Sequence, residues 1–164
     1  MRQILTALAA ALAVAAATAP ALAQAERPMF FESDDRDMNA AIAEARRTLP
    51  MFWRAYELRA GEQFTVKVAF DNSEGGREHL WIGNFRRNGD VFTGQLVNAP
   101  ALLPGKKLGD WMEFSEHQIS DWSYVKNNRL WGSFTTRVIL SRMDPSALPE
   151  LRAFLSPTPV EPGI

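Results

Sequence analysis

The chain contains no cysteine, and this absence excludes disulfide bonds, a thiol nucleophile and zinc–thiolate sites. Histidine is also scarce, with His79 and His117 as the two in the whole sequence. Each follows a glutamate, but neighbours on a strand point to opposite faces, so neither pair has the spacing of metal ligands on one element. The sequence therefore predicts no metal site and no cofactor, and a fold that is held together by packing alone.

Common catalytic signatures are missing as well. The sequence has no G-x-S-x-G, S-x-x-K or H-E-x-x-H pattern and no glycine-rich phosphate loop, which removes the common hydrolase classes. Neither sign of charge is in excess, because 18 Lys and Arg residues stand against 19 Asp and Glu residues, a net charge of −1. The basic pairs Arg86-Arg87 and Lys106-Lys107 lie in expected turns, where solvated charges are common. A general nucleic-acid-binding function is therefore not indicated.

Residues 1–23 have the composition of a secretory signal peptide. One basic residue precedes an alanine- and leucine-rich run, and small residues at Ala21 and Ala23 form a cleavage site before Gln24, with a second site before Glu26. There is no cysteine to accept a lipid and no twin arginine, so lipoprotein anchoring and export in the folded state are not indicated. We expect a periplasmic or secreted protein that has no membrane anchor after cleavage.

The rest of the chain is predicted to form one domain over residues 24–155, followed by a C-terminal tail. Its length and apolar content are sufficient for a single hydrophobic core. Residues 156–164 contain Pro157, Pro159 and Pro162, and this composition predicts an extended or disordered tail rather than a docking peptide.

A helical pattern begins after the acidic stretch at residues 33–35, which offers several N-cap residues. Apolar residues then recur at the three- and four-residue spacing of one buried stripe: Met38, Ala41, Ile42, Ala45 and Leu49. Because proline lacks a backbone N–H, Pro50 is expected to end or kink this helix. Residues 51–58 are then expected to form a second short helix.

Period-two alternation and turn residues predict strands in the middle of the chain. The clearest is 63–70, and the others are 78–85, 91–97, 111–115 and 119–125. The stretch 130–143 carries both strand and helix signals; a helix is preferred there, and a last short helix is expected over 144–155. These elements predict an α+β fold, with an N-terminal helix packed on a small antiparallel sheet and one or two C-terminal helices.

The strand that begins at Glu78 brings a carboxylate, an imidazole and an indole together. Strand alternation places His79 and Trp81 on one face, while Leu80 and Ile82 point to the core. A carboxylate near His79 could fix its tautomer for catalysis. The alternative is a histidine that is hydrogen-bonded for structural reasons beneath a covering loop or helix.

A second polar and aromatic group lies on the strand 119–125. Asp121 points to one face of this strand, and Trp122 and Tyr124 point to the other. We expect the two groups to converge, with His79 within hydrogen-bond or one-water reach of Asp121 or Tyr124. If Trp122 and Tyr124 share the face of His79, the site is an aromatic box; if Asp121 does, it is a carboxylate-oriented imidazole.

Six short motifs in consistent order cover about three quarters of the chain that follows the signal peptide. They are Met38-x-x-Ala41-x-x-x-Ala45-Arg46-x-Thr48-Leu49-Pro50, Phe64-x-Val66-Lys67, Glu78-His79-x-Trp81, Gly94-x-Leu96-x-Asn98-x-Pro100, Ile119-x-Asp121-Trp122-x-Tyr124 and Gly132-x-Phe134-Thr135-x-Arg137. In these motifs the chain resembles the YegJ-like family of exported bacterial proteins, domain of unknown function number 2314. The resemblance implies a shared scaffold and a shared polar and aromatic constellation, and it implies no reaction. Ser133 stands where a second glycine looks more typical.

The sequence favours a non-catalytic exported domain that binds an unknown protein or small-molecule ligand of the cell envelope. The expected contact residues are Trp81, Trp122, Tyr124, Lys67 and Asn98. The alternative is a cell-envelope hydrolase or lyase in which His79 is a general base oriented by Asp121, with Glu78 as a further catalytic candidate. A concave site around His79 would favour the enzyme, and a flat aromatic face would favour binding.

Overall fold

The computed structural model describes residues 35–162. The predicted signal peptide and both of its cleavage sites lie outside the described residues. The elements of this described part are, in chain order, α2 (Arg36–Glu57), β1 (Glu62–Asp71), β2 (Arg77–Asn88), β3 (Val91–Leu96), β4 (Trp111–Ser115), the 3-10 turn η1 (Glu116–Gln118), β5 (Ile119–Lys126), β6 (Arg129–Gly132), α3 (Phe134–Arg142) and α4 (Pro149–Phe154). Among these elements, no helix is long and apolar enough to cross a membrane.

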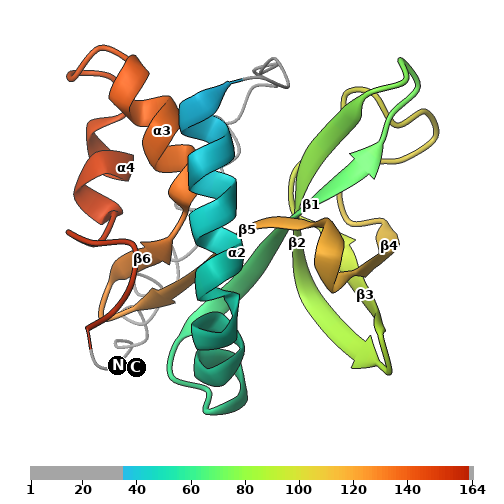
Figure 1. Cartoon of the computed structure of the whole chain (residues 1–164), viewed down its shortest axis with the longest axis horizontal. Coiled ribbons are helices and arrows are strands. Elements are labelled where there is room, and N and C mark those ends of the chain that lie inside the picture. Colours follow the sequence, from blue (N-terminus) through green and yellow to red (C-terminus); the bar gives the residue numbers. More distant parts are fainter. Residues whose placement is uncertain (1–34, 163–164) are drawn as a thin grey trace, which may run out of the picture.

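The strands form one antiparallel sheet in the order β4-β3-β2-β1-β5-β6. Helix α2 lies in front of the middle of this strongly twisted sheet, and α3 and α4 lie beside α2 near β6 (Figure 1). The predicted α+β class, with an N-terminal helix on an antiparallel sheet and C-terminal helices, is confirmed.

Helix α2 runs through Pro50 to Glu57, so residues 51–58 do not form the second short helix that the sequence predicts. A proline in a helix interior costs about 3 kcal/mol because one backbone hydrogen bond is lost. That cost is offset here because the residues after Pro50 continue the buried stripe, with Phe52 and Ala55 both fully buried. Ile42, in contrast, is only half-buried, because Ala41 and Ala45 face the core instead.

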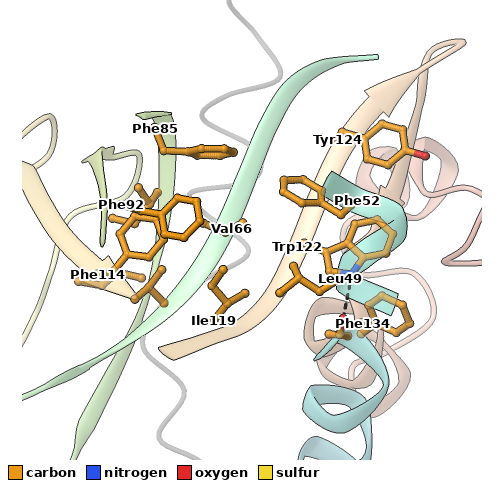
Figure 2. Packing of buried hydrophobic residues seen from close by; sticks show 14 of the residues in the cluster. Leu49, Phe52, Val66, Phe85, Phe92, Phe114, Ile119, Trp122, Tyr124 and Phe134 are labelled. Atoms are coloured by element: carbon orange, nitrogen blue, oxygen red, sulfur yellow. Dashed lines mark hydrogen bonds between the residues drawn. The ribbon is translucent and has the colours of Figure 1, made fainter. Parts of the chain in front are cut away.

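The core between α2 and the sheet is rich in aromatic residues. The ring of Phe52 contacts those of Trp122, Tyr124 and Phe85 with centroid distances of 5.6, 6.5 and 6.2 Å. Figure 2 shows these rings together with Phe92 and Phe114, which extend the core toward the far end of the sheet. The indole Nε1 of Trp122 also donates hydrogen bonds to α2, at 3.0 Å to the carbonyl of Ala45. Trp122 therefore fixes β5 against the helix.

The stretch 130–143 contains both predicted elements in sequence. Its first residues belong to β6, and the preferred helix is confirmed as α3 over Phe134–Arg142. Between them Gly132 and Ser133 both adopt left-handed backbone angles, with φ of 74° and 55°. A Cβ at Gly132 would lie 2.1 Å from the carbonyl oxygen of Trp122, so only glycine fits there. Helix α4 spans Pro149–Phe154 and is shorter than the predicted 144–155.

Candidate binding site on the polar face of the sheet

The face of the sheet opposite α2 carries half of the predicted site residues. Register pairs Lys67 on β1 with Trp81 on β2 and with Asp121 on β5, so the three lie in one row across the sheet. They point away from α2 because their neighbours Val66 and Trp122 are in the core. We call this side the polar face and define it by Thr65, Lys67, His79, Trp81, Asp121 and Ser123.

Lys67 is a buried lysine in the centre of the polar face, with 5% of its surface exposed. Its ammonium group lies 4.7 Å from the centroid of the Trp81 ring and donates a 3.0 Å hydrogen bond to Oγ1 of Thr135. A cation over an indole ring is attracted by about 1 to 2 kcal/mol, depending on how far both are desolvated. The predicted contact residues Lys67 and Trp81 therefore lie together, and each limits the motion of the other.

Asp121 is completely buried and caps helix α3 from the neighbouring strand. Its Oδ2 accepts hydrogen bonds from the backbone N–H and the hydroxyl of Thr135, at 2.8 and 2.6 Å. Its Oδ1 accepts hydrogen bonds from the N–H groups of Phe134 and Trp122, at 3.1 and 2.8 Å. The N-cap residue Ser133 makes no capping bond with its own side chain, so Asp121 supplies the acceptor that the helix start requires.

The charges of Asp121 and Lys67 are linked through the hydroxyl of Thr135, which donates to the carboxylate and accepts from the ammonium group. Burial raises the pKa of Asp121, and the positive charge of Lys67 opposes that rise. The same hydrogen bonds show that Asp121 does not orient His79, contrary to the enzyme hypothesis. Both carboxylate oxygens are engaged by β5 and α3 instead.

His79 is exposed, and its ring pairs with Ser120 rather than with Asp121 or Tyr124. Nδ1 of His79 lies 2.8 Å from Oγ of Ser120, and that hydroxyl donates to the carbonyl of Lys67 at 3.2 Å. The hydroxyl of Ser120 therefore links the imidazole of His79 to the backbone of β1. Ser120 itself is fully buried, so it cannot act as a nucleophile on a substrate.

Ser120 was not identified from the sequence, because its position depends on an irregularity in β5. The register of β1 and β5 shifts between Lys67, which pairs with Asp121, and Val68, which pairs with Ile119. Ser120 is the extra residue opposite this shift, and such a bulge redirects a side chain. Strand alternation alone carries no signal for it.

Glu78 and Asn98 use their side chains to hold the segment that follows β3. The carboxylate of Glu78 accepts hydrogen bonds from the N–H groups of Ala101 and Leu102, at 2.6 and 2.9 Å. The amide oxygen of Asn98 accepts the N–H of Trp81 at 2.8 Å. Glu78 is therefore placed as a structural anchor and not as a catalytic group, and Asn98 supports the backbone of Trp81.

The prediction that Trp122 and Tyr124 form part of an exposed binding surface is wrong. Their exposed fractions are 1% and 2%, and both rings pack under α2 against Phe52 (Figure 2). The physical reason is the alternation of side chains along a strand. Because Asp121 points to the polar face, Trp122 and Tyr124, one and three positions later, point to the core. The pattern could not show which of the two faces α2 would cover.

Residues 35–162 contain no group of three or more His, Cys, Asp and Glu side chains that could hold a metal ion. The polar face therefore combines a partly exposed indole, an exposed imidazole and two hydroxyl groups, Thr65 and Ser123, whose oxygens lie 2.7 Å apart. Chemically, these groups can stack on and hydrogen-bond to a ligand.

Comparisons with known proteins agree with the motifs. The chain is 26% identical over 122 residues to the "Uncharacterized protein YegJ" of Escherichia coli (strain K12). The aligned region covers 74% of this chain and 79% of that protein. It is also 32% identical over 123 residues to a Neisseria meningitidis serogroup B protein named "Putative ankyrin repeat protein". This aligned region covers 70% of this chain and 49% of that protein. The chain thus spans about half the length of the meningococcal relative.

No solved structure matches the chain. The profile of a bacterial family, described as "Uncharacterized protein conserved in bacteria (DUF2314)", matches residues 35–153. This range includes every helix and strand from α2 to β6, together with α3 and nearly all of α4. The chain therefore belongs to the DUF2314 family of bacterial proteins, as the motifs predict.

Proposed function

We propose that the protein is an exported, non-catalytic binding domain of the cell envelope, and that Trp81 and His79 on the polar face contact its ligand. The observation that carries this proposal is the contact of the Lys67 ammonium group with the Trp81 ring, at 4.7 Å. This contact holds the indole on the face of the sheet opposite the core residues Val66 and Trp122. Rigid aromatic side chains lose little entropy on binding and often carry much of the contact energy.

His79 lies two residues from Trp81 on the same strand and the same face. The hydrogen bond between His79 and Ser120 fixes the orientation of the imidazole. An aromatic surface and a hydrogen-bonding group are therefore offered side by side in a fixed geometry. A protein or a small molecule that presents both apolar and polar groups would fit this arrangement.

The same contacts favour binding over the hydrolase or lyase alternative. That alternative needs either a carboxylate beside His79 or an accessible nucleophile. Asp121 is engaged at the start of α3, and Ser120 is buried.

Export is supported by the composition of residues 1–23. The mature protein is expected to begin at Gln24 or Glu26, and N-terminal mass analysis of the protein from the periplasm or medium measures this directly. A stable exported form that retained Met1 would contradict the proposed cleavage.

The binding proposal is tested by capture from a native periplasmic extract with the immobilised mature protein. Trp81→Ala and His79→Ala remove the two proposed contacts. His117→Ala is the matched control, because His117 is also exposed, also follows a glutamate and also pairs with a serine hydroxyl, Ser115, at 2.9 Å.

A component that binds the polar face should be retained by the wild type and by His117→Ala. Its affinity for Trp81→Ala or His79→Ala should fall at least about tenfold, the usual scale for a central contact residue. Near-UV circular dichroism confirms that each variant is folded. Equal retention by all four proteins would show that the polar face is not the binding surface.

A further inference from the structure

The outer edge of β6 is covered by the tail of the same chain. Two backbone groups of β6, the carbonyl of Leu130 and the N–H of Gly132, are hydrogen-bonded to the tail. The N–H of Ser156 donates to the first at 3.0 Å, and the second donates to the carbonyl of Pro159 at 2.7 Å. A parallel bridge between Leu130 and Leu155 begins this pairing. The tail therefore covers the β6 edge through one isolated bridge and two backbone hydrogen bonds, and the chain bends over residues 157–160.

Side chains of the domain recognise both ends of this tail segment. At its start, the guanidinium group of Arg137 donates to the carbonyl and to the hydroxyl of Ser156, at 3.0 and 2.9 Å. At its end, the ammonium group of Lys126 donates to both carboxylate oxygens of Glu161, at 2.6 and 2.8 Å. The hydroxyl of Tyr124 lies 3.4 Å from the same carboxylate.

The β6 edge lies inside the region that the family profile matches, and the tail residues that cover it lie outside that region. The family profile matches residues 35–153, so β6, Lys126 and Arg137 belong to the shared domain, whereas Ser156 and Glu161 lie beyond the match. An edge strand with unpaired backbone groups is a template for another extended segment. The domain therefore carries a complete set of backbone and side-chain contacts for a segment that lies outside the shared region.

We infer that the outer edge of β6 is a binding site for a peptide of a partner protein, and that residues 156–161 occupy it as an internal pseudo-ligand. The seated tail defines what the site accepts. It is a peptide that enters parallel to β6 and carries a carboxylate five residues after a small hydroxyl residue. Peptide addition to a sheet edge is a common mode of recognition, in which side-chain pockets supply the specificity. This inference is independent of the polar face.

A segment tethered to its own site competes at an effective concentration of roughly millimolar, so a free peptide cannot displace the wild-type tail easily. Releasing the tail should therefore uncover the site. Glu161→Lys in the full mature chain does this without removing residues, because it places two positive charges, on residue 161 and Lys126, against each other. Glu113→Lys makes the same charge change on β4, at the opposite edge of the sheet, and is the matched control.

The probe is a fluorescently labelled peptide with the sequence of residues 155–164, and binding is measured by anisotropy. The Glu161→Lys variant should bind it at least about tenfold more tightly than the wild type or Glu113→Lys. The Lys126→Glu variant should bind this peptide more weakly than the Glu161→Lys variant does. It should bind a second peptide, in which Glu161 is replaced by lysine, more tightly than the first. Such a reversal requires direct recognition of the carboxylate at the β6 edge, and loss of a merely structural contact would not produce it.

Three results would overturn the inference. The first is a folded Glu161→Lys variant that does not bind the peptide, and the second is equal binding by the variant and the wild type. The third is a concentration-dependent dimer of Glu161→Lys in sedimentation, which would assign the edge to a second copy of the chain. If Glu161→Lys fails to fold, Lys126→Glu, which breaks the same ion pair, is tested against the charge-reversed peptide with the same three criteria.

Discussion

The carboxylate of Asp121 accepts the backbone N–H of Thr135 at 2.8 Å, and this bond joins the middle of β5 to the first turn of α3. It connects two motifs that are separate in the sequence, Asp121-Trp122-x-Tyr124 and Gly132-x-Phe134-Thr135. Gly132 permits the close approach, because a side chain there would collide with the backbone of Trp122. The two motifs are therefore one structural unit, in which a buried strand residue caps a helix.

We predict that Asp121→Ala destabilises the domain by about 3 to 5 kcal/mol, because it removes a carboxylate that opposes the buried charge of Lys67 and the acceptor at the start of α3. Urea unfolding measures the change. The double variant Asp121→Ala with Lys67→Met should be more stable than Asp121→Ala alone, because the buried charge is removed. A single variant that unfolds like the wild type would show that Asp121 does not cap α3.

A second prediction concerns the stripe of α2 that faces the core. Phe52→Ala should cost about 3 to 5 kcal/mol, because Phe52 is fully buried among aromatic rings and its truncation leaves a cavity. Ile42→Ala should cost clearly less, because Ile42 is half-buried. Thermal and urea unfolding of the two variants give the comparison. Equal losses would mean that Ile42 is as deeply packed as Phe52.

Local patterns were sufficient to predict most of the sheet and the fold class. The alternation of apolar residues in β1 and the Asn-Gly and Asn-Asn turns define hairpins whose partners are close in sequence. In the Asn127–Asn128 turn, both residues adopt left-handed angles, with φ of 52° and 55°, as a two-residue hairpin requires. Such features depend on a few neighbouring residues, and the sequence contains them all.

What could not be predicted depends on contacts between distant segments. Helix α2 continues through Pro50 because Phe52 packs against β5, about seventy residues later in the chain. Which face of β5 is buried follows from where α2 lies, and Ser120 reaches His79 through a shift in register. The structure therefore brings the predicted contact residues Lys67 and Trp81 together and places Trp122 and Tyr124 in the core, on the other face.

The third prediction is a pH dependence at the junction of α2 and α3. A hydrogen bond from Arg142, more than any other factor, lowers the pKa of Asp35 below its ordinary value of 3.8. A lowered pKa in the folded state means that the ion pair stabilises the fold above pH 3.8 and that this contribution is lost as the pH falls below it. Because both groups are at the surface, the effect is expected to be modest and to weaken in high salt.

Urea unfolding of the wild type and of Arg142→Gln at several pH values measures this contribution. The difference in stability between the two proteins should be present at neutral pH and should shrink on acidification below pH 3.8. Arg47→Gln is the matched control, because Arg47 pairs with Glu44 within one turn of α2 and joins no second element. A difference between wild type and Arg142→Gln that is independent of pH would assign the role of Arg142 to packing.

The last prediction concerns Tyr124 and the tail residue Glu161. Burial, and after it the negative charge and hydrogen bond of Glu161, raise the pKa of Tyr124 from 10.0 to about 12. A phenol whose pKa is raised in the folded state favours folding as long as it stays neutral, so the stability of the domain should fall as the pH rises from 10 toward 12.

The sequence has one other tyrosine, Tyr56, and Tyr56→Phe leaves Tyr124 as the only chromophore of its kind. In that background, the absorbance of the tyrosinate ion should give a midpoint near 12, and adding Glu161→Gln should lower it to a value that still lies above 10, because burial remains. A midpoint near 10 in the protein with Glu161 intact would show that water reaches the Tyr124 hydroxyl and that the tail does not cover it.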